Sequence, residues 1–405
     1  VLLRAAEWCG RRGRVPLLAA VLLLLPLVLL VGFVVASPPR KGLPTVPLAS
    51  DSAVSLRLPP LVGHSVASVV DQTVLSDPRC RDMESKFRLD DRLTKPDFVF
   101  IGGAKCGSTS FSEYFPAHPD IREVRMKEPN FWSYPEVMHV TPAGYQSMLG
   151  TPAAGSGYHK GPMADWNLDP MRGEGSICGE YSTSYIMHPL VPRRLFTEVP
   201  NAKIIMFLRN PIDRAYSQYT MQRRAGIERD LSFEEVINLE MKEFAAVRES
   251  FRHCFSQGYS CDASACLPEL PFKHHSKAGS YYMNGELDMK AFFFTSYLAR
   301  SMYDDMVERW LTVFPREQVM IMQSERFFSD PASVMEEITS WMGLSYFEWS
   351  STEVLKESWG GGASNAFDPR SYKELSPETR RDLATFYRPY NERLFSIIGE
   401  RYDWD

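Results

Sequence analysis

The sequence predicts an α/β fold in which a parallel sheet is flanked by helices on both faces. From about residue 96 onward, short apolar runs alternate with stretches whose apolar residues recur at helical spacing. Such alternation is typical of strand–helix–strand units, and sheets built from them are parallel and covered on both faces. At 405 residues with 44% hydrophobic residues, the chain is long enough to bury a core of this kind.

Three apolar runs are the predicted strands. They are FVFIGG from Phe98, NAKIIMFLRN with its apolar centre Ile204–Leu208, and QVMIMQSERF from Gln318. Each is short and contains β-branched or aromatic residues, as buried strands do. Ligands of parallel sheets bind at the carboxyl ends of the strands, so the loops after Ile101 and Leu208 form the predicted binding edge.

The predicted helices lie between and after these strands. TSFSEYFPAHP and PIDRAYSQYTMQRR follow the first two strands, and SFEEVINLEMKEF opens with Ser232 and Glu235 at capping-box spacing. DPASVMEEITSWMGL is entered through Asp-Pro, and the last helix starts at Ser376-Pro377 and is predicted to break at Pro389. One face of a further long helix is predicted from the spacing of Leu298, Met302, Met306, Trp310 and Val313.

The N-terminal part predicts a membrane anchor followed by a linker. Residues 15–36, VPLLAAVLLLLPLVLLVGFVVA, carry no charge and can span a bilayer, and the preceding tail 1–14 is rich in arginine. Residues 37–94 are rich in Ser, Pro and small residues and are the predicted stem, with the main domain at 95–405. A cleaved signal peptide is the alternative, although no clear cleavage site follows. The favoured interpretation is a single-pass protein with a luminal domain, as in Golgi enzymes or tethered receptor domains.

Charge and cysteine content restrict the partners and the compartment. The net charge of −5 provides no basic field, so nucleic acid is not a predicted partner. Cys106 and Cys178 are expected to be buried free thiols. In a lumen, two of three clustered cysteines are expected to form a disulfide, with Cys80 available to the third. These three are Cys254, Cys261 and Cys266, which lack the paired C-x-x-C spacing of a zinc site.

The segment FVFIGGAKCGSTS, residues 98–110, combines a strand, two glycines, a lysine and a small-residue cluster. Glycine amides and hydroxyls ahead of a helix form an anion cradle that suits a phosphate. In the nucleoside triphosphate loop G-x-x-x-x-G-K-S/T, however, lysine directly follows the last glycine. Here Lys105 precedes Cys106, Gly107 and Ser108. The order therefore predicts a phosphate compound other than Mg-ATP and disfavours a P-loop kinase.

Two further motifs carry candidate site residues. In IIMFLRNPIDRAYSQY a strand ends at Arg209 and Ser217 follows on the next helix. An arginine fork with a hydroxyl can clamp a terminal phosphate, although a surface ion pair is the alternative interpretation. In MKEPNFW, residues 126–132, Glu128 stands beside Lys127 and two aromatic residues. It is a candidate general base or, alternatively, half of a solvated charge pair.

Together the three motifs resemble those of the sulfotransferase superfamily, specifically its membrane-anchored carbohydrate branch. The closest likeness is to the N-acetylgalactosamine 4-sulfate 6-O-sulfotransferases, with heparan sulfate N- and O-sulfotransferases as more distant relatives. It covers roughly residues 95–405 and rests on AKCGS, KEPNFW, GEYSTSY, the ASNA of 363–366 and FYRPYNERL.

The resemblance implies a P-loop-like sulfotransferase fold and a 3′-phosphoadenylyl sulfate co-substrate, with no metal. The sulfuryl group would pass to a hydroxyl of a polysaccharide, sulfated or unsulfated, of a glycosaminoglycan type such as chondroitin or dermatan. Glu128 would be the general base, Lys105 a second catalytic residue, and Arg209 with Ser217 the 3′-phosphate clamp. The 5′-phosphosulfate group would be held by Lys105, Cys106, Gly107, Ser108, Thr109 and Ser110.

One departure from the heparan sulfate enzymes stands out. Several of them place a lysine after the glutamate of an E-K-T/S stretch, where this chain has Tyr181 after Glu180. A second cation near the sulfate would then have to come from elsewhere, for example from Lys127, and the departure favours the galactosaminoglycan enzymes. The competing hypothesis is a non-catalytic, tethered glycan-binding protein. It predicts the loss of Lys105 or Glu128, and both are present.

Overall fold

The structure is a computed structural model of the chain. It describes residues 85–122, 126–133, 140–149, 176–228, 231–242, 282–283, 286–287, 296–353, 355 and 375–404. All of them belong to one unit, Val62–Asp405. The predicted anchor, the cysteines proposed for the disulfide and the ASNA stretch lie outside the described residues. In the part of the chain that is described, no helix is long and apolar enough to cross a membrane.

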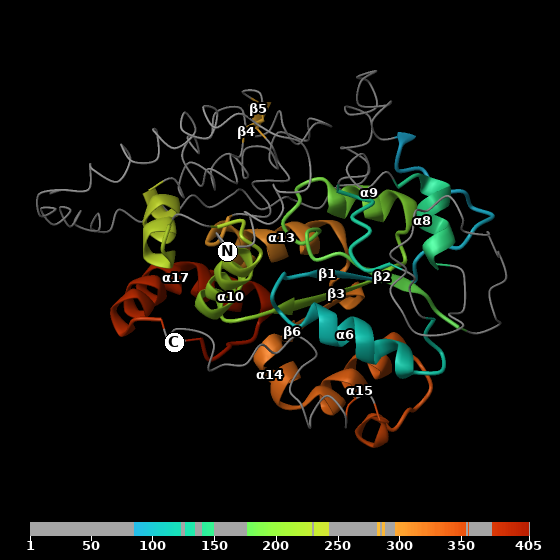
Figure 1. Cartoon of the computed structure of the whole chain (residues 1–405). Helices are drawn as coiled ribbons and strands as arrows, with labels where there is room; N and C mark the ends of the chain where they lie inside the picture. The colour runs from blue at the N-terminus through green and yellow to red at the C-terminus, as the bar shows by residue number, and fades with distance from the viewer. Residues whose placement is uncertain are drawn as a thin grey trace, which may run out of the picture. The chain divides into compact units, whose positions relative to one another are not determined.

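Four parallel strands form the central sheet, in the order β2-β1-β3-β6 (Figure 1). They are β1 Phe98–Gly102, β2 Gly179–Tyr181, β3 Lys203–Leu208 and β6 Val319–Gln323. The three predicted strands are confirmed, and the run after Cys178 adds β2 at one edge. A separate antiparallel pair joins β4, Tyr282–Met283, to β5, Glu286–Leu287. In the four-stranded sheet the carboxyl ends of the strands therefore point the same way, as the predicted binding edge requires.

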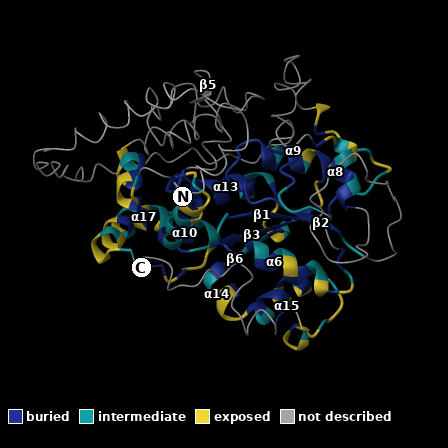
Figure 2. Cartoon of the chain, viewed as in Figure 1, coloured by how far each residue is buried: buried dark blue, intermediate teal, exposed yellow. Residues whose placement is uncertain are grey.

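Helices cover both faces of the sheet. Successive side chains of a strand point to opposite faces, so the apolar strands present two apolar faces, and each packs against helices. Phe98 and Phe100 of β1 belong to one buried cluster, and Val99 and Ile101 to another. The buried residues gather on the strands and on the helix sides that face them (Figure 2). The first cluster is covered by α6 Ser108–Tyr114, α14 Ser324–Ser329 and α15 Pro331–Met342. The second is covered by α8 Pro142–Leu149, α9 Val191–Glu198, α13 Tyr303–Val313 and α17 Pro377–Ile398.

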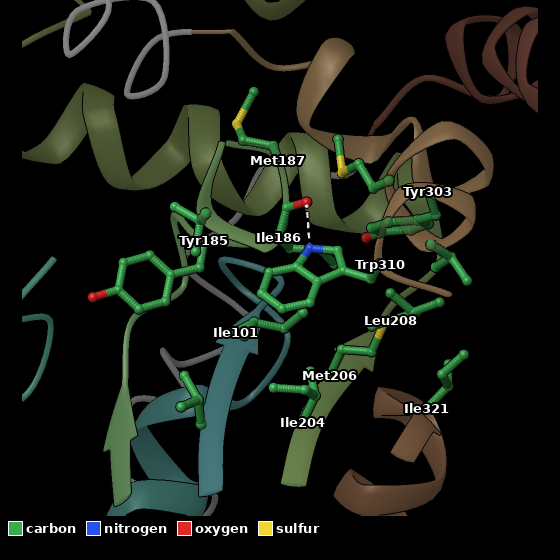
Figure 3. Packing of buried hydrophobic residues seen from close by; sticks show 14 of the residues in the cluster. Ile101, Tyr185, Ile186, Met187, Ile204, Met206, Leu208, Tyr303, Trp310 and Ile321 are labelled. Atoms are coloured by element: carbon green, nitrogen blue, oxygen red, sulfur yellow. Dashed lines mark hydrogen bonds between the residues drawn. The ribbon is translucent and has the colours of Figure 1, made fainter. Parts of the chain in front are cut away.

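Trp310 of α13 fills the centre of the second cluster, beside Ile101 and Met206 of the sheet (Figure 3). The side chain is fully buried, and its Nε1 donates to the carbonyl oxygen of Ile186 at 3.1 Å. The indole N–H therefore keeps a hydrogen-bond partner although the ring is buried. The bond also ties the segment that follows β2 to α13, and this segment reaches the candidate site.

Several helix predictions are confirmed with their end signals. α10 spans Pro211–Arg224, and Asn210 caps it by accepting from the amide of Ile212 at 3.0 Å. Residues 233–242 are helical, and the capping box forms, with Ser232 and Glu235 exchanging bonds of 2.9 and 3.2 Å. Asp330 caps α15. Short 3-10 turns are η1 Phe115–Ala117, η4 Ala299–Ser301, η5 Arg316–Gln318 and η6 Trp349–Ser351.

Two predicted elements differ in length from the structure. The helix predicted from Leu298 starts later, because η4 comes first and Met302, at ψ 67°, interrupts the helical path before α13. Acidic residues in the first turn of α13, such as Asp304, favour a start there. The predicted strand QVMIMQSERF ends at Gln323, and its second half forms α14. The apolar pattern located these segments but not their ends.

The predicted break at Pro389 is wrong, because α17 continues through it. Pro389 is exposed, so the backbone carbonyl that its ring deprives of a partner can bond to water. The opposite side of the helix is held by burial of Leu383, Tyr387, Leu394 and Phe395. Tertiary packing therefore overrides the local helix-breaking signal.

The folded core includes residues that lie in the predicted stem. Phe87 and Leu89 are buried in the second cluster. The ring of Phe87 lies 4.0 Å below the guanidinium of Arg194, and the amide of Leu89 donates to Glu198 at 2.9 Å. Residues just before 95 are thus packed against the domain.

Candidate active site

The loop between β1 and α6, with the first turn of α6, is called the anion loop here and comprises residues 103–110. Lys105 and Gly107 lie in the left-handed region, at φ 68° and 97°. A Cβ added to Gly107 would come within 2.8 Å of the Phe328 ring. Both the positive φ and this close approach therefore favour glycine at the position. The amides of the first helical turn have no intrahelical partners and can bind an anion.

The tip of β3 and the C-terminal half of α10 lie beside the anion loop. Arg209 donates from Nη1 to the carbonyl oxygen of Lys105 at 3.1 Å. The Nζ of Lys105 lies 3.7 Å from Sδ of Met221 on α10. Ser217 precedes Met221 by four residues on the same helix and therefore shares its face. The structure thus brings the first two predicted motifs together at the sheet edge.

Positive charge is concentrated at this edge. Burial lowers the pKa of Lys105, and the charges of Arg209 and Arg224 lower it further. Burial likewise lowers the pKa of Lys127. Desolvated cations that repel one another are stabilised by a bound anion, because it restores the charged form of each. The electrostatics therefore favour a phosphate or sulfate ligand at the anion loop.

Cys106 belongs to the loop but faces the protein interior. Its Sγ is buried 3.8 Å from the hydroxyl of Tyr303, its amide donates to Gly103, and its carbonyl accepts from Ser324. Burial raises the pKa of this thiol. The expectation of buried free thiols at Cys106 and Cys178 is confirmed, but a direct ligand contact by the Cys106 side chain has no support in this geometry.

The third motif forms a second loop, residues 126–133, called the base loop here. Glu128 has φ 57°, and its amide donates to the carbonyl of Tyr181 at 2.8 Å. Thr183 donates to both carboxylate oxygens, from its amide to Oε2 and from Oγ1 to Oε1, each at 2.9 Å. Burial raises the pKa of Glu128, whereas Lys127 and Thr183 oppose the rise. The result is a partly desolvated carboxylate in a fixed orientation.

Lys127 links the two loops. Its Nζ donates to Oγ1 of Thr109, in the first turn of α6, at 2.5 Å. Tyr181, which occupies the position of the missing lysine, lies in the buried cluster beside Phe98, with ring centroids 5.8 Å apart. The side chain at that position therefore packs in the core, and Lys127 is a cation that adjoins both loops.

The sequence did not single out the residues that hold Glu128 in place. Thr183 and Glu180 belong to the quoted stretch GEYSTSY, a polar run directly after a strand, but no spacing rule connects them to Glu128. Glu180 is completely buried, and burial raises its pKa to about 8 against hydrogen bonds that lower it. Within the described ranges, no group of three or more His, Cys, Asp and Glu residues could hold a metal ion.

Comparison with known proteins finds a family match and distant relatives. Residues 95–364 match the sulfotransferase domain family. Bifunctional heparan sulfate N-deacetylase/N-sulfotransferase 2 of Bos taurus is 26% identical over 81% of this chain and 32% of its own length. Heparan sulfate glucosamine 3-O-sulfotransferase 3B1 of Mus musculus is 25% identical over 91% of this chain and 82% of its own. Membrane-associated sulfotransferase kil1 of Dictyostelium discoideum is 24% identical over 77% and 67%.

The family match agrees with the predicted sulfotransferase resemblance, and the relatives correct the predicted ranking. The chain spans about a third of the length of the first relative. Two of the relatives are heparan sulfate enzymes by name, which the sequence had placed behind the N-acetylgalactosamine 4-sulfate 6-O-sulfotransferases. That ranking was wrong because it weighed a few short motifs, whereas the likeness to the first relative extends over 345 residues.

Proposed function

Because the chain belongs to the sulfotransferase domain family, we propose that it transfers a sulfuryl group from 3′-phosphoadenylyl sulfate to a glycan hydroxyl. The observation that carries the proposal is the 2.5 Å contact of Lys127 with Thr109, which joins the base loop to the anion loop. In-line transfer needs the sulfuryl donor and the base close together, and such positioning supplies much of the rate enhancement. Because Glu128 directly follows Lys127 in the chain, this contact brings the candidate base near the anion loop.

In this proposal the two anionic ends of the sulfuryl donor occupy the two motifs at the sheet edge. The anion loop amides, with Ser108, Thr109 and Ser110, bind the 5′-phosphosulfate end, and Arg209 with Ser217 binds the 3′-phosphate. Lys105 adjoins both motifs, since Arg209 contacts its carbonyl and α10 contacts its ammonium. Its charge can then stabilise the bridging oxygen without a metal ion.

The chemical step is an in-line displacement at sulfur. The acceptor oxygen forms a bond to sulfur while the bond from sulfur to the bridging oxygen breaks. The leaving electron pair stays on the 5′-phosphate of adenosine 3′,5′-bisphosphate, beside Lys105. Glu128 accepts the hydroxyl proton, and its raised pKa makes it a better base than a solvated carboxylate.

Lys127 supplies the second cation at the sulfuryl group in this scheme. Tyr181 cannot provide it, because a phenol carries no positive charge, and its ring packs in the core. Lys127 reaches the first turn of α6 and lies close enough to Glu128 to oppose the rise in its pKa. A cation at this point can balance the negative charge shared by the transferring group and the base.

The proposed acceptor is a glycosaminoglycan. Heparan sulfate is the acceptor named for two of the relatives, and it is the first candidate. Tyr181 in place of the heparan-type lysine favours chondroitin or dermatan, which is the second candidate. The two share a repeating uronic acid and amino sugar, so either offers acidic groups and acceptor hydroxyls to the positively charged sheet edge.

Two measurements test the proposal. Adenosine 3′,5′-bisphosphate is expected to raise the melting temperature without magnesium, and ATP with magnesium is not. The purified protein is then incubated with ³⁵S-labelled sulfuryl donor and heparan sulfate, heparosan, chondroitin and dermatan. Stabilisation by ATP–magnesium alone would indicate a kinase. Binding of both donor product and glycan with no transfer would indicate the tethered glycan-binding protein.

The proposed location is the Golgi membrane, with residues 15–36 as anchor and the C-terminal domain in the lumen. An uncharged segment of this length is stable in hydrocarbon, and one relative is named membrane-associated. A C-terminal tag in intact microsomes should be protected from protease. Digestion of the tag without detergent would overturn the orientation.

A further inference from the structure

The carboxyl group of Glu180 lies at the centre of three hydroxyl groups. Tyr145 donates to Oε1 at 3.0 Å, and Ser182 and Tyr185 donate to Oε2 at 3.3 Å each. Glu180 lies on β2, the strand at one edge of the sheet, and has no exposed surface. A buried carboxyl group is costly unless its oxygens are bonded, so these three hydroxyls are strongly oriented toward it.

Each of these hydroxyls also accepts an N–H group from the base loop. Tyr145 accepts from the indole Nε1 of Trp132 and Tyr185 from the amide of Trp132, both at 3.2 Å. Ser182 accepts from the amide of Asn130 at 3.1 Å. Glu180 thereby polarises three hydroxyls that all hold one short segment of the base loop.

That segment in turn holds the backbone at Glu128. Asn130 Nδ2 donates to the carbonyl oxygen of Glu128 at 2.8 Å, and its own Oδ1 accepts from Ser184 at 2.5 Å. Glu128 and Asn130 both have positive φ, at 57° and 50°, a conformation that non-glycine residues rarely adopt without support. The bonds to Asn130 supply that support, so the path from Glu180 to Glu128 is continuous.

We propose that Glu180 is a positioning residue that acts through Tyr145, Tyr185 and Ser182 to hold the base loop, and with it Glu128, in the productive conformation. The inference rests on the proposed role of Glu128 as general base. Glu180 would contact neither the sulfuryl donor nor the acceptor. Its effect would therefore appear in turnover and not in donor affinity.

The test is a double-mutant cycle with Glu180→Ala and Glu128→Gln. Alone, Glu180→Ala is expected to lower kcat roughly 10- to 100-fold, the order of loss caused by misplacing a catalytic group. The Kd for adenosine 3′,5′-bisphosphate should stay within about twofold. Added to Glu128→Gln, the same change should lower kcat less than about twofold, because the base through which it acts is already lost. Equal losses in both backgrounds would show a merely structural role and overturn the inference.

A readout independent of activity separates this inference from the proposed function. In Glu180→Ala, amide hydrogen exchange should speed up in peptides covering 126–133 and stay unchanged in those covering the anion loop. Unchanged exchange in the base loop, or an equal rise in both, would contradict the inference. An inactive wild-type protein that still shows the selective rise would instead count against the proposed function alone.

Two supporting variants guard against misfolding. Tyr145→Phe and Ser182→Ala each remove one hydroxyl and are expected to lower kcat by about threefold to tenfold, with the same non-additivity. Glu198→Ala is the matched control, because Glu198 is also a buried glutamate, but it accepts from the amide of Leu89, which precedes β1 and belongs to neither loop. Full activity in both supporting variants would overturn the inference even if Glu180→Ala does not fold.

Discussion

The anion loop and the base loop are joined by the contact of Lys127 with Thr109 but are built in different ways. The anion loop is a continuous strand, turn and helix start, and its shape depends on backbone conformation at Lys105 and Gly107. The base loop owes its shape to side chains of another segment, since Thr183 lies 55 residues from Glu128 in the sequence. One loop presents amides, and the other presents a single oriented carboxylate.

This difference implies that the anion loop mainly determines donor binding and the base loop mainly determines turnover. Many amides share the binding of an anion, so loss of one side chain of the anion loop should leave most of the binding in place. Lys105 is the exception, because its charge lies at the proposed bridging oxygen and its loss should lower turnover. A general base has no substitute, so changes in the base loop should affect turnover while leaving binding intact. The predictions below test whether binding and turnover separate along this line.

The largest expected effect is that of Glu128→Gln. The amide keeps size and hydrogen bonding but cannot accept the proton, so kcat should fall roughly 10²- to 10⁴-fold. The Kd for adenosine 3′,5′-bisphosphate and the melting temperature should hardly change. Glu113→Gln is the matched control, because Glu113 is an exposed carboxylate whose charge also acts on Lys127. Full activity in Glu128→Gln would remove this residue from the mechanism.

Next in size is the effect of Lys105→Ala, which removes charge at the proposed bridging oxygen. We expect kcat to fall roughly 10²- to 10³-fold, as for other lost transition-state contacts. Arg209→Ala, by comparison, should raise the Kd for adenosine 3′,5′-bisphosphate roughly 10- to 100-fold with a smaller change in kcat. Isothermal titration and initial rates on the same preparations measure both. Wild-type kinetics in both variants would show that the donor assignment is wrong.

A smaller loss is expected for Lys127→Met, about tenfold in kcat, because one of two cations at the sulfuryl group is removed. Lys127→Arg should recover most of the rate. Thr109→Val removes the 2.5 Å contact but keeps the cation. It also removes a hydroxyl proposed to bind the sulfuryl donor, so kcat is compared at saturating donor. Lys95→Met serves as control, because Lys95 pairs with the exposed Asp91 at the surface. If Thr109→Val and Lys127→Met lower kcat equally, Lys127 acts as a tether and not as a charge.

The smallest effect is a change in pH dependence in Thr183→Ala. The lost Oγ1 bond favours the charged form of Glu128, so its removal should raise the pKa of Glu128. Because the base must be ionised, the acidic limb of the kcat profile should move to higher pH, by roughly 0.7 of a pH unit for a bond worth about 1 kcal/mol. Thr183→Ser keeps the hydroxyl and should follow the wild type. A shift to lower pH would contradict the assigned bond.

The sequence by itself determined the features that depend on neighbouring residues. The three apolar runs became β1, β3 and β6, and the capping signals at Ser232 and Asp330 located helix starts, because these are local effects of backbone and side chain. The order of glycines and lysine in the anion loop was likewise enough to disfavour an Mg-ATP loop. Local signals failed where packing opposed them, as at Pro389 in α17.

Only the tertiary structure decided how the site is held. The contacts of Glu128 with Thr183, and the bonds that lead from Glu180 to Asn130, join segments about 50 residues apart. No periodicity or spacing encodes such pairs, because they depend on how β2 is placed beside β1 and on the segment that Trp310 holds in place. Burial, which raises the pKa of Glu128, is also a property of the packed molecule. The sequence thus identifies Glu128 as the candidate base, and folding supplies the burial and the hydrogen bonds on which the proposed role depends.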